Sequence, residues 1–78
     1  MKIEDACKFS AGNRASVAQA VNVGCYFCLR TFAAGEVKEW VDQDNTALCP
    51  HCGIDSVLPE VTDTAFLSAA HEHWFSAS

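Results

Sequence analysis

Apolar residues recur at helical spacing near the start of the chain. The stretch "KIEDACKFSAG" places Ile3, Ala6 and Cys7 three and four residues apart, which predicts an amphipathic helix over residues 3–12. We expect Cys7 to be a small buried residue of that helix. Asn13 follows the helix and is a typical N-cap, so "RASVAQA" after it predicts one or two further helical turns.

The segment after Pro59 predicts the longest helix of the chain, over residues 63–76. Thr62 or Asp63 can cap its first turn, since short polar side chains accept hydrogen bonds from the free N–H groups there. A continuous apolar stripe then runs along one side of "VTDTAFLSAAHEHWFSA" and comprises Phe66, Leu67, Ala70 and Trp74.

Two histidines near the end of this helix lie two positions apart. Residues at that spacing point to nearly opposite sides of a helix, so His71 and His73 are not expected to share a metal. His71 lies on the side of the apolar stripe and should be half-buried at the edge of the core. We expect His73 and Glu72 to face solvent.

The middle of the chain fits two patterns. Val37, Trp40 and Val41 have helical spacing, but "VKEWV" is also short and rich in β-branched and aromatic residues, as strands are. The turn-forming "DQDN" follows, and "TALC" after it is typical of a returning strand. We favour a β-hairpin preceded by a helical turn at "AAGE".

Four cysteines form two pairs with a two-residue gap, "CYFC" and "CPHC". The overall pattern is C-x2-C-x20-C-x2-C, and it comprises Cys25, Cys28, Cys49 and Cys52. A two-residue gap lets one tight turn present two sulfurs to one ion, and zinc prefers four such ligands in a tetrahedron. The pattern predicts one structural Zn²⁺ per chain, although iron suits the same four sulfurs.

Each cysteine turn needs a residue that tolerates a left-handed backbone directly after its second cysteine. Gly53 fills that position in the second turn, where Pro50 also stiffens the entry. Leu29 fills it in the first turn, at the cost of strain or of a different local path. His51 lies inside the second turn, and we expect it to point to solvent because four thiolates complete the coordination.

Two other uses of the cysteines remain open. They could form disulfides, or one pair could be a thioredoxin-like redox motif, but such a motif usually opens a helix in a βαβ unit. Neither pair is followed by a convincing long helix. In "GIDSVLPE", after the second pair, Asp55 could accept backbone hydrogen bonds; a catalytic Asp–Ser pair is the alternative, for which no base or oxyanion site can be named.

These elements predict a small α+β zinc-bound domain that spans residues 1–78. A zinc-ribbon β-hairpin over residues 23–58 would carry the metal, and the N-terminal and C-terminal helices would flank it. A treble-clef-like arrangement is the alternative. A chain of 78 residues has a small core, and chains of this size often require a metal or disulfides for stability.

Charge and hydropathy narrow the classes of function. Ten acidic residues against five basic ones give a net charge of −5, which is unfavourable for binding a phosphate backbone. Neither a signal peptide nor a membrane span is apparent, so we expect a cytoplasmic protein without a membrane partner. In a reducing compartment, paired cysteines more often bind metal than each other.

The motifs "GCYFCLRTF", "EVKEW", "TALCPHCGIDSVLP" and "HEHWF", with "CKFSAGNR" near the start, resemble a family of short bacterial proteins described only as cytoplasmic. The resemblance spans nearly the whole chain and includes a C-P-x-C-G-I-D-S-V motif. It implies that the four paired cysteines bind zinc in the cytoplasm, and it implies no particular activity. Family members also end in a His and a Trp-Phe pair, which correspond to His71, Trp74 and Phe75.

We therefore expect a non-enzymatic module that binds another protein. The aromatic end of the chain could be the contact surface if it is exposed; otherwise Trp74 and Phe75 close the core. A zinc ribbon that acts with nucleic acid in transcription or translation is a second hypothesis, although the basic residues are scattered along the sequence. A thiol redox protein is the third.

Overall fold

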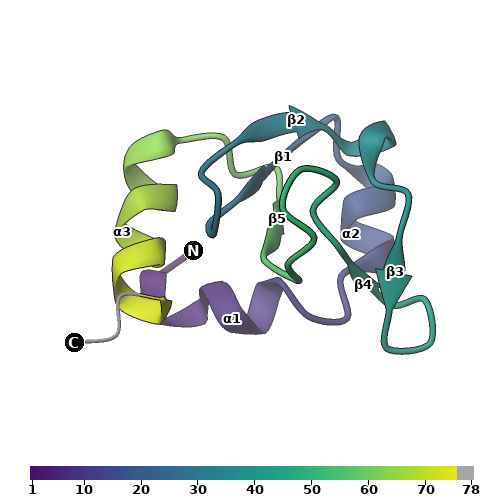
Figure 1. The fold of residues 1–78 in the computed structure, drawn as a ribbon, viewed down its shortest axis with the longest axis horizontal. Helices are drawn as coiled ribbons and strands as arrows, with labels where there is room; N and C mark the ends of the chain where they lie inside the picture. The colour runs from purple at the N-terminus through teal and green to yellow at the C-terminus, as the bar shows by residue number, and fades with distance from the viewer. Residues whose placement is uncertain (76–78) are drawn as a thin grey trace.

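The computed structural model describes residues 1–75, which form short helices and two small antiparallel sheets (Figure 1). The first half contains η1 (Ile3–Asp5), α1 (Ala6–Phe9), α2 (Arg14–Gln19), β1 (Asn22–Cys25), β2 (Thr31–Ala33) and η2 (Ala34–Glu36). The second half contains β3 (Trp40–Val41), β4 (Thr46–Ala47), β5 (Val57–Pro59) and α3 (Thr64–Trp74).

Strand β1 is the centre of the larger sheet, whose strand order is β2-β1-β5. Val23 of β1 lies opposite Phe32 on one side and Pro59 on the other, and both pairings are antiparallel. The smaller sheet consists of β3 and β4, with Trp40 opposite Ala47. The chain is therefore a small α+β structure, as the sequence predicts, and it contains two antiparallel sheets.

Strands β1 and β5 contribute buried residues to both faces of the larger sheet, since neighbouring strand residues point to opposite faces. Val57 and Cys25 belong to a cluster that also contains Val17, Val23, Phe32, Val37, Ala47 and Cys49. The next residues along the chain, Leu58 and Tyr26, belong to a second cluster with Ala6, Leu67 and Ala70. The sheet thus separates a cluster beside α2 and the cysteines from a cluster beneath α1 and α3.

The helices at the two ends of the chain pack together on one face of the sheet. Ala6 of α1 and Leu67 of α3 share the second cluster, and Trp74 Nε1 donates a hydrogen bond to the Ile3 carbonyl at 2.9 Å. The two helices predicted to flank the zinc-bearing segment therefore also pack against each other. Figure 1 shows α3 beside the N-terminus, with α1 continuing beneath the sheet.

The N-terminal helix is shorter than the predicted range 3–12. It begins as a 3-10 turn, and its α-helical part ends at Phe9. Ser10 Oγ bonds the Cys7 carbonyl at 3.0 Å, and Gly12 has φ 59, so the backbone leaves the helical path there. A local hydrogen bond of this kind competes with further helical turns.

Cys7 is exposed, so its predicted burial is wrong. The inward residues of this segment are Ala6, which is fully buried, and Ser10, four positions later. Four residues complete about one turn of an α-helix, so a segment this short turns one narrow line of residues inward and leaves the next residue in solvent.

The middle of the chain forms the predicted hairpin, with strands of only two residues each. The predicted helical turn at "AAGE" is the 3-10 turn η2, and α2 provides the predicted turns in "RASVAQA". Positive φ angles at Asp42, Gln43 and Asp44 close the hairpin at "DQDN". The sequence does not predict β1, β2 or β5, and hence it misses the larger sheet.

Helix α3 matches the prediction at its start. Asp63 Oδ1 accepts a hydrogen bond from the Ala65 N–H at 2.9 Å, as an N-cap does. The helix ends at Trp74. Residue 76, where the predicted helix ends, lies outside the described residues.

Candidate metal centre

The first cysteine turn lies between β1 and β2. Cys25 is the last residue of β1, and its carbonyl accepts a hydrogen bond from the Leu29 N–H at 3.0 Å, which closes the turn around Cys28. The Phe27 N–H points at Cys25 Sγ, at 3.4 Å. Leu29 has φ 65, so the strained left-handed alternative predicted for this position is the one adopted.

The second turn repeats this geometry between β4 and β5. The Gly53 N–H donates to the Cys49 carbonyl at 2.8 Å, and the His51 N–H points at Cys49 Sγ at 3.4 Å. Gly53 has φ 77, as predicted. In both turns, a backbone N–H group points at the sulfur of the first cysteine and partly compensates its negative charge when it is a thiolate.

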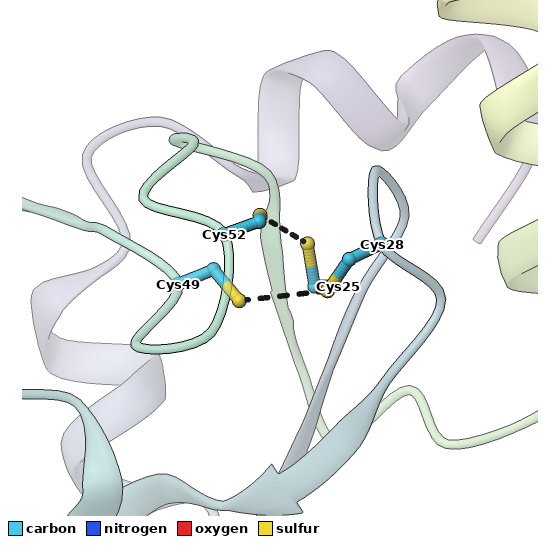
Figure 2. A group of neighbouring side chains, drawn as sticks. All are labelled: Cys25, Cys28, Cys49 and Cys52. Atoms are coloured by element: carbon cyan, nitrogen blue, oxygen red, sulfur yellow. Dashed lines mark hydrogen bonds between the residues drawn. The ribbon is translucent and has the colours of Figure 1, made fainter.

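The two turns bring all four sulfurs together (Figure 2). Each Sγ atom of Cys25, Cys28, Cys49 and Cys52 lies within 4.8 Å of the other three. The shortest contacts join one turn to the other, at 3.6 Å between Cys25 and Cys52 and 3.8 Å between Cys28 and Cys49. All four are free thiols, so they form no disulfide in this structure.

These distances fit a tetrahedral metal. A Zn–S bond of ~2.3 Å gives a sulfur–sulfur edge of about 3.8 Å in a regular tetrahedron. The two short contacts, 3.6 and 3.8 Å, have this length. The donor set is four soft sulfurs with no carboxylate or imidazole among them, which suits zinc or iron. The four cysteines could therefore hold a metal ion, and they would supply all four ligands.

The environments of the four sulfurs differ. Cys25 and Cys49 are buried, whereas Cys28 and Cys52 are half-buried. Burial favours a higher pKa of the Cys25 thiol, but hydrogen bonds from Ser56 and from the backbone outweigh burial and lower its pKa. Burial raises the pKa of both Cys28 and Cys52. In the absence of a metal, Cys25 is thus the thiol of these three that ionises most readily.

His51 lies beside the centre and outside the sulfur cluster. Its Nε2 atom is 3.7 Å from Glu36 Oε1, and its ring packs edge-on against Phe32 with centroids 5.2 Å apart. The side chain is 32% exposed. The group of side chains that could hold an ion among the described residues does not include it.

The other predicted histidines lie on α3, apart from the cysteines. His71 is half-buried, as predicted, with Nδ1 3.2 Å from the Tyr26 carbonyl and its ring against Phe27 and Phe75. His73 is exposed, also as predicted. His71 therefore connects the end of α3 to the first cysteine turn.

The aromatic residues at the end of α3 divide between core and surface. Phe75 packs against the second core cluster, with its ring 5.4 Å from that of Tyr26. Trp74 is 40% exposed, and Phe27 of the first cysteine turn is 38% exposed. The expectation that both terminal aromatics close the core thus holds for Phe75 and is wrong for Trp74.

Ser56 belongs to the site, although sequence reasoning did not assign it there. It is fully buried, and its Oγ atom lies 3.0 Å from Cys25 Sγ. The neighbouring Asp55 is exposed, so the two do not form a buried catalytic pair. The sequence does contain a signal for this role. Ser56 directly precedes the apolar residues Val57 and Leu58, which suggests that it is buried with them, and a buried hydroxyl requires a hydrogen-bond partner.

Comparisons with protein-family models, with curated proteins and with solved structures found no match. The resemblance inferred from the sequence motifs therefore stays a prediction. Among the described residues, no helix has both the length and the apolar character needed to cross a membrane.

Proposed function

We propose that the chain is a zinc-stabilised protein-interaction module. The observation that carries the metal assignment is the convergence of four thiols, each sulfur within 4.8 Å of the others, from two turns of the same geometry. Four protein ligands leave no coordination position for water or substrate, so the zinc has a structural role and the module is not an enzyme. We assign zinc rather than iron because a purely structural role needs no redox activity, and Zn²⁺ has none.

The order of elements around the cysteines supports a zinc ribbon. The first turn connects the paired strands β1 and β2, and the second leads into β5, which returns to pair with β1. In a treble clef, the second pair of ligands would come from the start of a helix. Here the residues after Cys52 lead to a strand, which favours the ribbon.

The metal would be a main source of stability for so short a chain. Structural zinc in comparable peptides binds with an apparent free energy of about 10–16 kcal/mol at neutral pH. Cys25 and Cys49 are themselves part of the first core cluster. Without the positive charge of the ion, the four sulfurs would be held close together inside this cluster with nothing to bind them. We therefore expect metal and fold to be lost together.

The surface proposed for partner binding lies where α3 meets the first cysteine turn. Phe27 and Trp74 are both more than a third exposed, and Phe27 packs edge-on against Phe75 with centroids 4.9 Å apart. Phe27 also packs against His71, so it meets the same end of α3 that carries Trp74, and exposed large aromatic residues favour protein docking. A net charge of −5 disfavours nucleic acid, so the proposed partner is another protein, in the cytoplasm.

The metal assignment is tested by a native mass spectrum of freshly purified protein, repeated after chelation. We expect one zinc per chain, lost only as the fold is lost. Cys25→Ser should abolish stoichiometric zinc, whereas the matched control Cys7→Ser should retain it, since Cys7 is exposed and outside the cluster. A mass lower by two or four hydrogens, with no metal, would instead indicate disulfides and favour thiol redox chemistry.

The docking surface is tested by photo-crosslinking in cells of the wild type and of Phe27→Ser. We expect a discrete crosslinked protein that is lost in Phe27→Ser and kept in the control Val21→Ser, whose side chain is 75% exposed near the opposite end of β1. Equal crosslinking in Phe27→Ser and Val21→Ser would exclude this surface. Association with nucleic acid that weakens steeply with salt would favour the alternative of a nucleic-acid-binding ribbon.

A further inference from the structure

Ser56 lies between the second cysteine turn and β5, yet its side chain reaches the first turn. The residue is fully buried, and Oγ lies 3.0 Å from Cys25 Sγ. Its carbonyl accepts a hydrogen bond from the Tyr26 N–H at 3.1 Å, which fixes the backbone of Ser56 against the residue next to Cys25. The hydroxyl is therefore held at the sulfur by the pairing of β1 with β5.

The direction of this hydrogen bond follows from the chemistry of a metal ligand. A cysteine that binds zinc does so as a thiolate, which has no proton to donate. The Ser56 hydroxyl must then be the donor and Cys25 Sγ the acceptor. Hydrogen bonds to an ionised acceptor are about twice as strong as those between neutral groups.

We propose that Ser56 is a positioning residue of the metal centre: its hydroxyl donates a hydrogen bond to the Cys25 thiolate, fixes this ligand and reduces the charge that the sulfur donates to the metal. The inference rests on the proposed metal site and extends it to a residue outside the ligand set. Partners of this kind orient the ligands and tune the metal.

Cys25 receives more hydrogen bonds than the equivalent residue of the second turn. The backbone provides one donor to the sulfur in each turn, from Phe27 to Cys25 and from His51 to Cys49, both at 3.4 Å. Within residues 1–75, the hydroxyl that bonds a cysteine sulfur is that of Ser56. Ser56 thus makes the two otherwise similar turns unequal, because Cys25 Sγ has a second donor that Cys49 Sγ lacks.

The first test compares the zinc affinity of Ser56→Ala, Ser56→Thr and Ser10→Ala by competition with a chromophoric chelator. Loss of an outer partner of a ligand typically costs about 10–100-fold in metal affinity, and we expect such a loss for Ser56→Ala. Ser56→Thr keeps the hydroxyl and should retain affinity. Ser10 is a matched control, because it is 3% exposed and hydrogen-bonds Tyr26 without contacting a paired cysteine.

A second readout separates tuning of the metal from general packing. With iron in place of zinc, hydrogen bonds to the sulfurs help to set the reduction potential. We expect a lower potential in Ser56→Ala than in the wild type, because the hydrogen bond stabilises the more negative reduced state, and no change in Ser10→Ala. Equal affinity and equal potential in Ser56→Ala and Ser10→Ala would overturn the proposal.

A measurement on the wild type decides the question if Ser56→Ala does not fold. In protein loaded with ¹¹³Cd, we expect a slowly exchanging Ser56 hydroxyl proton with scalar coupling to the metal through Cys25 Sγ. A hydroxyl proton that exchanges rapidly and shows no coupling would overturn the proposal. If the wild type binds no zinc, iron or cadmium, both the proposed function and this inference fail; if it binds them and Ser56 has no effect, only the inference fails.

Discussion

Leu29 and Gly53 occupy equivalent positions in the two cysteine turns and have nearly the same backbone conformation. Each follows the second cysteine of its pair, each donates its N–H to the carbonyl of the first cysteine, and their φ angles are 65 and 77. Glycine adopts this left-handed region at no steric cost, whereas a residue with a Cβ atom loses about 1–2 kcal/mol there. The first turn therefore carries strain that the second turn does not.

We predict that Leu29→Gly is more stable than Leu29→Ala by about 1 kcal/mol. Both variants lose the partly exposed leucine side chain, and only the glycine variant relieves the strained φ. At the equivalent position, Gly53→Ala should destabilise by a similar amount. Thermal unfolding of the zinc-loaded variants tests this, since 1 kcal/mol shifts the Tm of a chain of this size by about 4–8 °C.

The order of the two Leu29 variants is the decisive comparison. Alanine is usually the more stable of the two residues where φ is negative, because glycine has more conformational freedom to lose. A higher Tm for Leu29→Ala than for Leu29→Gly would therefore show that the first turn does not adopt the left-handed conformation.

Gly24 of β1 packs tightly against Val61, which precedes α3, and against Leu67 of α3. A Cβ atom there would collide with the Val61 carbonyl oxygen and lie 2.9 Å from a methyl group of Leu67, so no side chain fits unless the backbone before α3 moves. We predict that Gly24→Ala destabilises the protein by about 1–3 kcal/mol, as overpacked core positions do. Chemical unfolding at a fixed zinc concentration measures this loss.

Gly35→Ala is the matched control for this prediction. A Cβ atom at Gly35 would meet nothing within 4 Å, and the residue is not at positive φ. We expect its stability to stay within about 0.5 kcal/mol of the wild type. Equal effects of the two substitutions would contradict the close packing of α3 on β1.

The cluster of four cysteines could be predicted from the sequence because the geometry of each cysteine turn is local. Each turn is defined over five consecutive positions, by the two-residue gap and by the residue at positive φ directly after it, and the structure has both turns. The capping of α3 by Asp63 and the hairpin turn at "DQDN" are local in the same sense. Short-range chemistry of this kind is readable without knowledge of the rest of the fold.

The larger sheet and the role of Ser56 could not be predicted because they depend on partners far along the chain. Strands β1 and β5 have four and three residues, which is too short for a clear alternation of apolar and polar positions. Their pairing, Cys25 opposite Val57, is what brings Ser56 to the sulfur. Cys7 was misassigned for a related reason, because a helix of four residues has no well-defined apolar stripe.

Asn13 is a buried polar residue that connects three segments. It is 5% exposed, its Nδ2 atom donates to the carbonyls of Val57 at 2.9 Å and Phe9 at 3.2 Å, and its Oδ1 atom accepts from the Ala47 N–H at 3.2 Å. The side chain was predicted to cap α2, and it instead joins the two sheets. The predicted capping by Asn13 is therefore wrong, since its side chain makes no hydrogen bond to the first turn of α2.

We predict that Asn13→Ala destabilises the protein by at least about 2 kcal/mol, because buried backbone groups of both sheets lose their partner. Asn22→Ala is the control, since the Asn22 side chain is exposed, and it should change the free energy of unfolding by less than about 0.5 kcal/mol. Chemical unfolding of both variants at fixed zinc concentration compares them. A small effect of Asn13→Ala would mean that water replaces the amide.

Tyr26 is the single tyrosine of the chain and provides a pH-dependent signal from inside the second core cluster. Burial raises the pKa of its phenol above the ordinary value of 10.0, against the lowering effect of the hydrogen bond with Ser10. We predict that phenolate absorbance near 295 nm develops above pH 10 in the folded protein.

The same shift predicts how stability depends on pH. The folded-state pKa of Tyr26 lies above the unfolded-state value. The contribution of the neutral phenol to the free energy of unfolding is therefore fully present below pH 10, and it is lost as the pH rises through the folded-state pKa. Tyr26→Phe cannot ionise, and its free energy of unfolding should therefore fall less than that of the wild type over this range. Both proteins would be unfolded in urea at several pH values, with zinc in excess. Parallel pH profiles would show that the phenol is no more buried in the folded protein than in the unfolded chain.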